Sequence, residues 1–248
     1  MEALLAALGG AIIGSFLNVV IARVPAKESL VSPGSKCPSC GTPIKAYDNV
    51  PIVSWLLLRG RCRSCGERIS PRYPLVEALT AAVFAGVVLA GGADADLALE
   101  LPFAAVLIVI AFIDLDHRII PNRILLPTAI YGLAVGALVD LDAMPEMLIA
   151  GAAAFTFLLV AALAYPAGMG MGDVKLAGVM GLFLGVAVAP ALLIAFAAGA
   201  AVGVAIIAKE GAAARKKGVP FGPFLAFGGI VAIIVGSEMV DLYSDRFL

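Results

Sequence analysis

The chain has 248 residues, of which 62% are hydrophobic and 14% are charged, and its formal net charge is −1 at pH 7. Soluble domains carry about 25% charged residues. This composition, with a mean hydropathy of +1.04, therefore excludes an ordinary soluble protein and predicts an all-α integral membrane protein. The near-neutral net charge gives no indication of nucleic-acid binding, and no nucleic-acid partner is expected.

The first predicted element is a transmembrane helix within residues 1–24. An apolar run over 3–22 is long enough to cross a bilayer, and it follows the acidic residue Glu2. A secretory signal begins with a basic segment and has a shorter apolar core, so a cleaved signal is the poorer interpretation.

Residues 25–74 form a polar segment, rich in proline, glycine and turn residues, which holds all four cysteines. Two CxxC pairs, Cys37 with Cys40 and Cys62 with Cys65, are separated by 21 residues. Four thiolates at this spacing are a tetrahedral ligand set suited to Zn²⁺. Because sulfur would fill every position, the metal would be structural. The alternative is a loop braced by disulfides, which a cytosolic location disfavours.

The rest of the chain, residues 75–248, is predicted to form a membrane core of about seven helices. Apolar runs of spanning length occupy 75–92, 97–113, 124–139, 147–165, 191–208 and 222–240. A shorter run at 176–189 falls below the ~20 residues of a perpendicular crossing, so it is either a short or tilted helix or an incomplete span. With it the chain has eight transmembrane helices, and without it seven.

The distribution of basic residues favours eight helices. With eight, 16 of the 17 basic residues lie in the loops of one side, and Arg246 is the exception. Cytoplasmic loops collect Lys and Arg, so both termini are expected outside and the cysteine loop is expected in the cytoplasm.

Two intramembrane carboxylates are candidates for chemistry. Asp173 follows the glycines of GMGD, and Asp114 follows an apolar run over 101–113. Ionised carboxylates in a bilayer are costly and mark functional sites. Two aspartates from different helices can share a proton and activate a water between them. Taken singly, Asp114 is also explained as a helix-end carboxylate and Asp173 as a helix N-cap.

Other polar residues have plainer interpretations. Asp116 and His117 are expected in the solvated headgroup region. Lys175 is explained either as a charge that lowers the pKa of a nearby carboxylate or as a charge that anchors the chain on the cytoplasmic side. Asn18 and Ser15, inside the first helix, are expected to form interhelix hydrogen bonds.

The motifs GMGD at 170–173 and IDLDHRIIPN at 113–122 resemble those of the bacterial type IV prepilin leader peptidases, which are intramembrane aspartic peptidases. Further landmarks follow in the family's order: GSFLNVVIARVP, the CxxC pairs, ISPRYPLVEALT and VPFGPFLAFGGI. The resemblance implies that Asp114 and Asp173 are the catalytic aspartates. It assigns no role to Asp116.

The resemblance also implies an activity and partners. Such enzymes remove the basic leader from prepilins and pseudopilins at the cytoplasmic face of the bacterial inner membrane, and many then methylate the new N-terminus with S-adenosylmethionine. The cysteine loop is typical of bifunctional members, although the chain lacks a Gly-rich βαβ turn for a soluble methyltransferase fold. The alternatives are a peptidase without methyltransferase activity, an ion-coupled transporter using both aspartates, and a non-catalytic zinc-bearing assembly factor.

Overall fold

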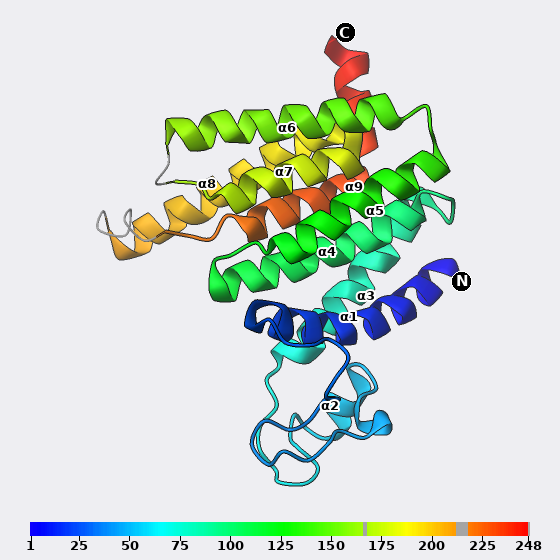
Figure 1. Cartoon of the computed structure of the whole chain (residues 1–248), viewed down its shortest axis with the longest axis vertical. Helices are drawn as coiled ribbons and strands as arrows, with labels where there is room; N and C mark the ends of the chain where they lie inside the picture. The colour runs from blue at the N-terminus through cyan, green and yellow to red at the C-terminus, as the bar shows by residue number, and fades with distance from the viewer. Residues whose placement is uncertain (166–167, 212–217, 248) are drawn as a thin grey trace. The chain divides into compact units, whose positions relative to one another are not determined.

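The computed structural model describes residues 1–165, 168–211 and 218–247 and is built from helices (Figure 1). Within these ranges the backbone forms no β-strand, only two isolated bridges. The predicted all-α class is therefore confirmed. The chain divides into two compact units, Met1–Ala93 and Asp94–Leu248. The basic residues of 212–217, which contribute to the predicted sidedness, lie outside the described residues.

The first unit consists of two long helices and the polar loop between them. Helix α1 spans Glu2–Ala26 and α3 spans Arg72–Gly91. They pack antiparallel, and they are so close that a Cβ added to Gly10 would lie 2.7 Å from the Thr80 carbonyl oxygen. The loop contains a 3₁₀ turn, Ala46–Asp48, and a short helix α2, Val53–Leu57.

The second unit contains the remaining long helices. They are α4 Leu97–His117, α5 Asn122–Val139, α6 Met144–Ala164, α7 Met171–Leu184, α8 Val188–Glu210 and α9 Gly222–Phe247. Their shared core is apolar and includes Phe103, Leu107, Met180 and Leu225. Small residues let backbones meet, as where Gly181 faces the Ala150 carbonyl.

By length and composition, seven segments of the described chain can cross a membrane, so this is a multi-pass membrane protein. One of the seven, Met171–Glu210, is 40 residues long and contains both α7 and α8. Between them lies a 3₁₀ turn, Gly185–Ala187, in which Gly185 adopts φ +53°. This left-handed backbone conformation favours glycine and interrupts the helix.

Helix α7 runs antiparallel to α4. Near its start, Asp173 lines the same pocket as Asp114 from the end of α4. Near its end, Phe183 stacks on Phe103 from the start of α4, with ring centroids 4.2 Å apart. The 14 residues of α7 span about 21 Å. The apolar run at 176–189 thus lies mainly in a short helix.

Helix α8 returns in the opposite direction. Near its start Ala191 faces Gly228 of α9, and at its middle Gly199 faces Phe221, just before the start of α9. Because α9 begins beside Asp114, the end of α8 lies at the Asp114 end of the unit. Met171–Glu210 is therefore a helical hairpin, and the predicted number of about eight helices is reached by counting its two arms separately.

Candidate active site and cysteine cluster

Asp114 lies in the last turn of α4 and is 5% exposed. The helix ends immediately afterwards, because Arg118 takes up a left-handed conformation, φ 55°, and its N–H donates to the Asp114 carbonyl at 2.9 Å. The Asp114 carboxylate accepts a 2.9 Å hydrogen bond from the N–H of Gly222, the first residue of α9. Asp114 thus lies at a helix end, and it is buried at a junction of two helices.

Asp173 lies in the first turn of α7 and is 8% exposed. Its Oδ2 accepts the Gly170 N–H at 3.0 Å, while its own N–H donates to the Gly170 carbonyl at 3.1 Å. This reciprocal pair satisfies backbone groups that a helix start leaves free. The capping interpretation is therefore correct in part, since Asp173 caps α7. The close approach of Ile120 to the backbone also explains the glycine at position 172, because a Cβ there would lie 3.0 Å from Ile120 Cβ.

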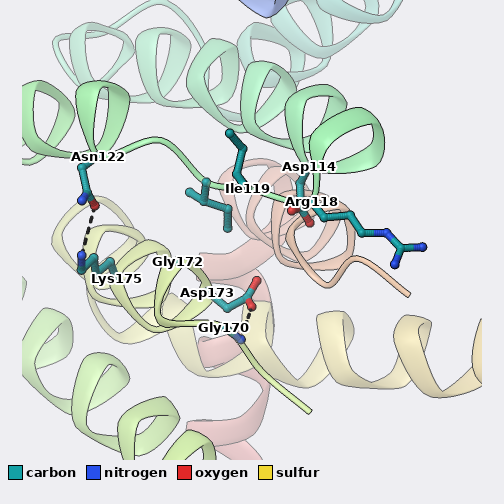
Figure 2. Close-up of a pocket in the computed structure, with 9 residues that line it drawn as sticks. Asp114, Arg118, Ile119, Asn122, Gly170, Gly172, Asp173 and Lys175 are labelled. Carbon is teal, nitrogen blue, oxygen red and sulfur yellow. Dashed lines mark hydrogen bonds between the residues drawn. The ribbon is translucent and has the colours of Figure 1, made fainter. Parts of the chain in front are cut away.

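The two carboxylates line one cavity of about 310 Å³. Figure 2 shows them on different sides of this pocket and pointing toward its interior. Arg118, Asn122 and Lys175 also line it, and the Lys175 ammonium donates to Asn122 Oδ1 at 3.1 Å. The structure thus brings together the two aspartates that lie 59 residues apart in the sequence.

Helix N-termini face both carboxylates. Asp114 accepts the first N–H of α9, and Asp173 belongs to the first turn of α7. The exposed N–H groups and the positive end of the helix dipole favour negative charge at these positions. Two carboxylates in one small cavity can act as a general acid and a general base toward a water held between them.

The second candidate site is the cysteine cluster of the first unit. One sulfur from each of Cys37, Cys40, Cys62 and Cys65 lies within 4.8 Å of the others, and the Cys37 and Cys65 sulfurs are 3.8 Å apart. A tetrahedral zinc site with Zn–S bonds of about 2.3 Å has sulfur–sulfur distances of about 3.8 Å. The four cysteines therefore fit a tetrahedral metal ion and form a cluster that can hold one.

Each CxxC pair forms the same turn. The Cys37 N–H donates to the Thr42 carbonyl at 3.0 Å and the Gly41 N–H donates to the Cys37 carbonyl at 2.9 Å. In the second turn, the corresponding bonds from Cys62 and Gly66 measure 2.8 and 2.9 Å. Both glycines have positive φ, 71° and 74°, as a glycine after each pair predicts.

The pKa values of the Cys40, Cys62 and Cys65 thiols are shifted, in both directions. A backbone hydrogen bond at Glu67 lowers the pKa of Cys65, but desolvation and contacts with Cys40, Cys62 and Cys37 outweigh it and raise that pKa to about 12. Contacts with the side chain and backbone of Thr42 lower the pKa of Cys40 to about 6, so this thiol is ionised at neutral pH. Backbone hydrogen bonds from Cys65 and Ser64 lower the pKa of Cys62 as well. Thiolates are the form that binds metal.

Comparison with known proteins identifies the family of the chain. Residues 8–90 match the bacterial peptidase A24 N-terminal domain, and residues 101–204 match the type IV leader peptidase family. The chain belongs to the type IV leader peptidase family. It is 36% identical over 235 residues to the prepilin leader peptidase/N-methyltransferase of Bacillus subtilis (strain 168), covering 94% of each chain. No solved structure matches it.

Two further relatives carry the same name. The protein of Myxococcus xanthus (strain DK1622) is 40% identical over 213 residues, or 84% of this chain and 64% of the relative. That of Aeromonas hydrophila is 36% identical over 268 residues, or 95% and 91%. Nothing in these comparisons favours a transporter.

Not every polar residue of the leader peptidase motifs reaches the pocket. Asp116 and His117 are exposed and do not line it, in keeping with a headgroup location. Asn18 is buried in the first unit, where its amide donates to the Tyr73 carbonyl of α3 at 3.1 Å. The predicted interhelix hydrogen bond is therefore present. Ser15 likewise hydrogen-bonds Glu77 of α3.

Two residues of importance were missed by sequence reasoning. Gly222 was noticed only as part of a family landmark, and nothing in its sequence context says that its N–H meets Asp114. Glu77 was also passed over, although a carboxylate inside an apolar helix is itself a signal. Its carboxylate is buried and accepts the Ile52 N–H of the polar loop at 2.7 Å.

Proposed function

We propose that this protein is an aspartic endopeptidase that removes the basic leader from type IV prepilins and pseudopilins. One observation carries the proposal: Asp114 and Asp173, buried on separate helices, line one cavity in a chain of the type IV leader peptidase family. The alternative of a carrier for ions has no comparable support.

In the proposed mechanism the two aspartates act as one unit. Two carboxylates in one small cavity cannot both ionise cheaply, so one keeps a proton. The ionised member accepts a proton from a water while that water attacks the scissile carbonyl carbon. The protonated member donates its proton to the carbonyl oxygen, and the tetrahedral intermediate then breaks as the leaving amine takes up a proton. The Gly222 and Gly170 N–H groups hold the two carboxylates in place.

The cysteine cluster is proposed to bind one structural Zn²⁺ through Cys37, Cys40, Cys62 and Cys65. Zinc bound by four sulfurs has no open position for a substrate or a water, and it supplies folding energy to the loop. The ion would therefore set the shape of residues 25–74, while the membrane core, 75–248, carries the peptidase site.

Methylation of the new N-terminus is proposed as a second activity, with S-adenosylmethionine as methyl donor. The support is the name shared by the relatives. A second cavity, about 500 Å³, is lined in part by Arg59, Arg61 and Arg68, whose charges repel a sulfonium cation. The described residues therefore do not fit the donor there, and we assign it no binding residues.

The proposed location is the bacterial inner membrane, with the peptidase pocket and the cysteine loop toward the cytoplasm. The support is the distribution of basic residues among the loops. A prepilin anchored in the same bilayer would present the junction of its leader at the cytoplasmic end of its helix, level with the pocket.

The decisive experiment is incubation of the purified, reconstituted protein with a prepilin and S-adenosylmethionine, followed by mass spectrometry of the product. We expect loss of the leader mass and, if methylation also occurs, one added methyl group on the new N-terminal residue. An uncut prepilin would refute the peptidase proposal, whereas a cut but unmethylated product would refute only the second activity.

A further inference from the structure

The short helix α2 in the cysteine loop presents an apolar surface that its own unit leaves uncovered. Val53, Leu56 and Leu57 are 51%, 61% and 78% exposed. On the other side, Ser54 is buried and the Trp55 indole N–H donates to the Ile69 carbonyl at 3.1 Å. We call Val53, Leu56 and Leu57 the α2 face. Its orientation is thus fixed by contacts on the opposite side.

A hydrogen bond ties the start of α2 to a membrane-spanning helix. The N–H of Ile52, directly before α2, donates to Glu77 Oε2 at 2.7 Å. Glu77 lies five residues, or about 7.5 Å, beyond Arg72 along α3. It packs against Gly14 of α1, since a Cβ on Gly14 would lie 2.7 Å from Glu77 Cα. Gly14 in turn lies nine residues, or about 13 Å, inside Arg23.

These contacts set the depth of α2. Arg23 and Arg72 flank the apolar runs of α1 and α3 and mark the headgroup level on this side. The Glu77 backbone is therefore about 7–13 Å inside that level. Ile52 hydrogen-bonds the Glu77 carboxylate, which is directed toward the Arg72 end of α3, so Ile52 lies between this depth and the headgroup level, at the inner edge of an interfacial layer about 5–8 Å thick. This is the depth at which interfacial helices bury their apolar face.

The backbone around α2 also meets the requirement of this environment. Lipid supplies no hydrogen-bond partners, so N–H groups at this depth need partners within the protein. The Val50 N–H donates to Ser54 Oγ at 3.1 Å, the Ile52 N–H to Glu77, and the Ser54 N–H to the Val50 carbonyl at 3.1 Å. A loop in free cytosol would not need a buried glutamate for one N–H.

We propose that the α2 face inserts into the headgroup–acyl boundary of the bilayer, so that part of the polar loop is an interfacial membrane element. The occupant of this surface is lipid. Near the start of α3, Tyr73 and Leu75 are also exposed apolar residues. The proposal depends on the membrane helices and on the Glu77 contact. It does not depend on the peptidase activity.

The chain offers a built-in probe, because Trp55 is its one tryptophan. The zinc-loaded full chain is reconstituted in vesicles of phosphatidylcholine and phosphatidylglycerol whose acyl chains carry bromine either near the headgroup or near the bilayer centre. We expect bromine near the headgroup to lower Trp55 fluorescence by at least about twofold, and bromine near the centre to have less effect. Aqueous iodide should quench Trp55 weakly.

Two variants provide the comparison. Leu57→Glu should reduce the quenching by lipid and raise the quenching by iodide, because a carboxylate opposes insertion of the α2 face. Val31→Glu is the matched control, since Val31 is 90% exposed in the same loop but lies outside the α2 face. It should behave like the unchanged protein. One zinc per chain in both variants would show that the loop remains folded.

Trp55 that is unaffected by brominated lipid would overturn the proposal. Equal quenching in the unchanged protein and in Leu57→Glu would overturn it as well, because the quenching would then not report insertion of this face.

Discussion

The cysteine cluster and the aspartate pocket are assembled in opposite ways. The four cysteines lie within residues 37–65, on two turns with the same hydrogen bonds, so local chain geometry places each pair. The aspartate pocket combines Asp114, Asp173 and the N–H of Gly222 from three helices. The first site depends on local turns, and the second depends on how helices pack.

The surroundings of the two sites differ accordingly. Between residues 27 and 71 the buried residues are Cys37, Ser54 and Gly60, so the loop has almost no apolar core of its own. The helices around the aspartates share a large core that includes Phe103, Leu107 and Met180. We infer that the loop needs a metal to hold its shape, whereas the pocket is held by helix packing.

Substitution of either aspartate should have the largest effect, and it should affect the aspartate pocket without affecting the cysteine cluster. Asp114→Asn and Asp173→Asn should each reduce prepilin cleavage by at least about 10³-fold, because a dyad loses its mechanism when either member is lost. Both variants should keep one zinc per chain and the unfolding temperature of the unchanged protein. Cleavage rates and metal content of the purified variants measure this.

Asp116→Asn is the matched control for Asp114→Asn. Asp116 lies two residues away, is exposed and does not line the pocket. The Asp116→Asn protein should cleave prepilin at close to the rate of the unchanged protein. If Asp116→Asn lost activity and Asp114→Asn kept it, the dyad would be assigned to the wrong aspartate. Methylation of a pre-cleaved pilin by both dyad variants would place the two activities at separable sites.

The next effect in size is expected for Gly222→Ala. The added Cβ would lie 2.7 Å from Asp114 Oδ2 and 3.0 Å from its Cγ, so either the carboxylate or the start of α9 must move. A displacement of about 1 Å in a catalytic group can cost about 10²-fold in rate. We expect a fall in kcat with zinc retained.

Gly203→Ala provides the control for this prediction. Gly203 lies on α8 with nothing within 4 Å of the added Cβ, so this change should leave the cleavage rate nearly unaltered. Full activity in Gly222→Ala would contradict the position given to Asp114 at the start of α9.

Cys62→Ser changes the cysteine cluster and leaves the aspartate pocket unaltered. With three thiolates the loop should lose most of its zinc and its shape, and cleavage should fall by about tenfold while the aspartate pocket stays intact. Metal content and cleavage rate are measured together, with Ser64→Ala in the same turn as control. A metal-free Cys62→Ser protein with full activity would show that cleavage does not require zinc.

The same contrast explains what could be predicted from sequence. The cysteine cluster was found from the spacing of the two CxxC pairs, because a short turn brings its own ends together. The helices were found from apolar runs. Asp114 and Asp173 were found because a carboxylate is conspicuous in apolar sequence.

What sequence could not supply was tertiary register. Gly222 meets Asp114 across 108 residues of chain, and no local pattern specifies that contact. The hairpin of α7 and α8 was uncertain for a related reason. Met171–Glu210 is apolar throughout, and only the backbone turn at Gly185 and the packing of each arm show that the chain reverses.

The smallest effect is expected at Arg63, which joins the two halves of the cysteine loop. Its guanidinium makes three hydrogen bonds to Asp48, at 3.0, 2.9 and 2.6 Å, and these bonds lower the pKa of Asp48. Arg63 also lies 5.6 Å from the centre of the Tyr47 ring. Because the Arg63 side chain is 56% exposed, water screens its charge, and Arg63→Ala should change cleavage by less than about twofold when zinc is bound.

Removal of the metal should reveal this contact. If zinc holds the loop, Arg63 is redundant in the loaded protein, but in the chelated protein it is one of few links between the two cysteine turns. Protease sensitivity of the loop should therefore be nearly equal for Arg63→Ala and the unchanged chain with zinc, and greater for Arg63→Ala after chelation. Added salt should narrow that difference, because it screens exposed charges. A large effect of Arg63→Ala in the zinc-loaded protein would mean that the ion pair, and not the metal, sets the shape of the loop.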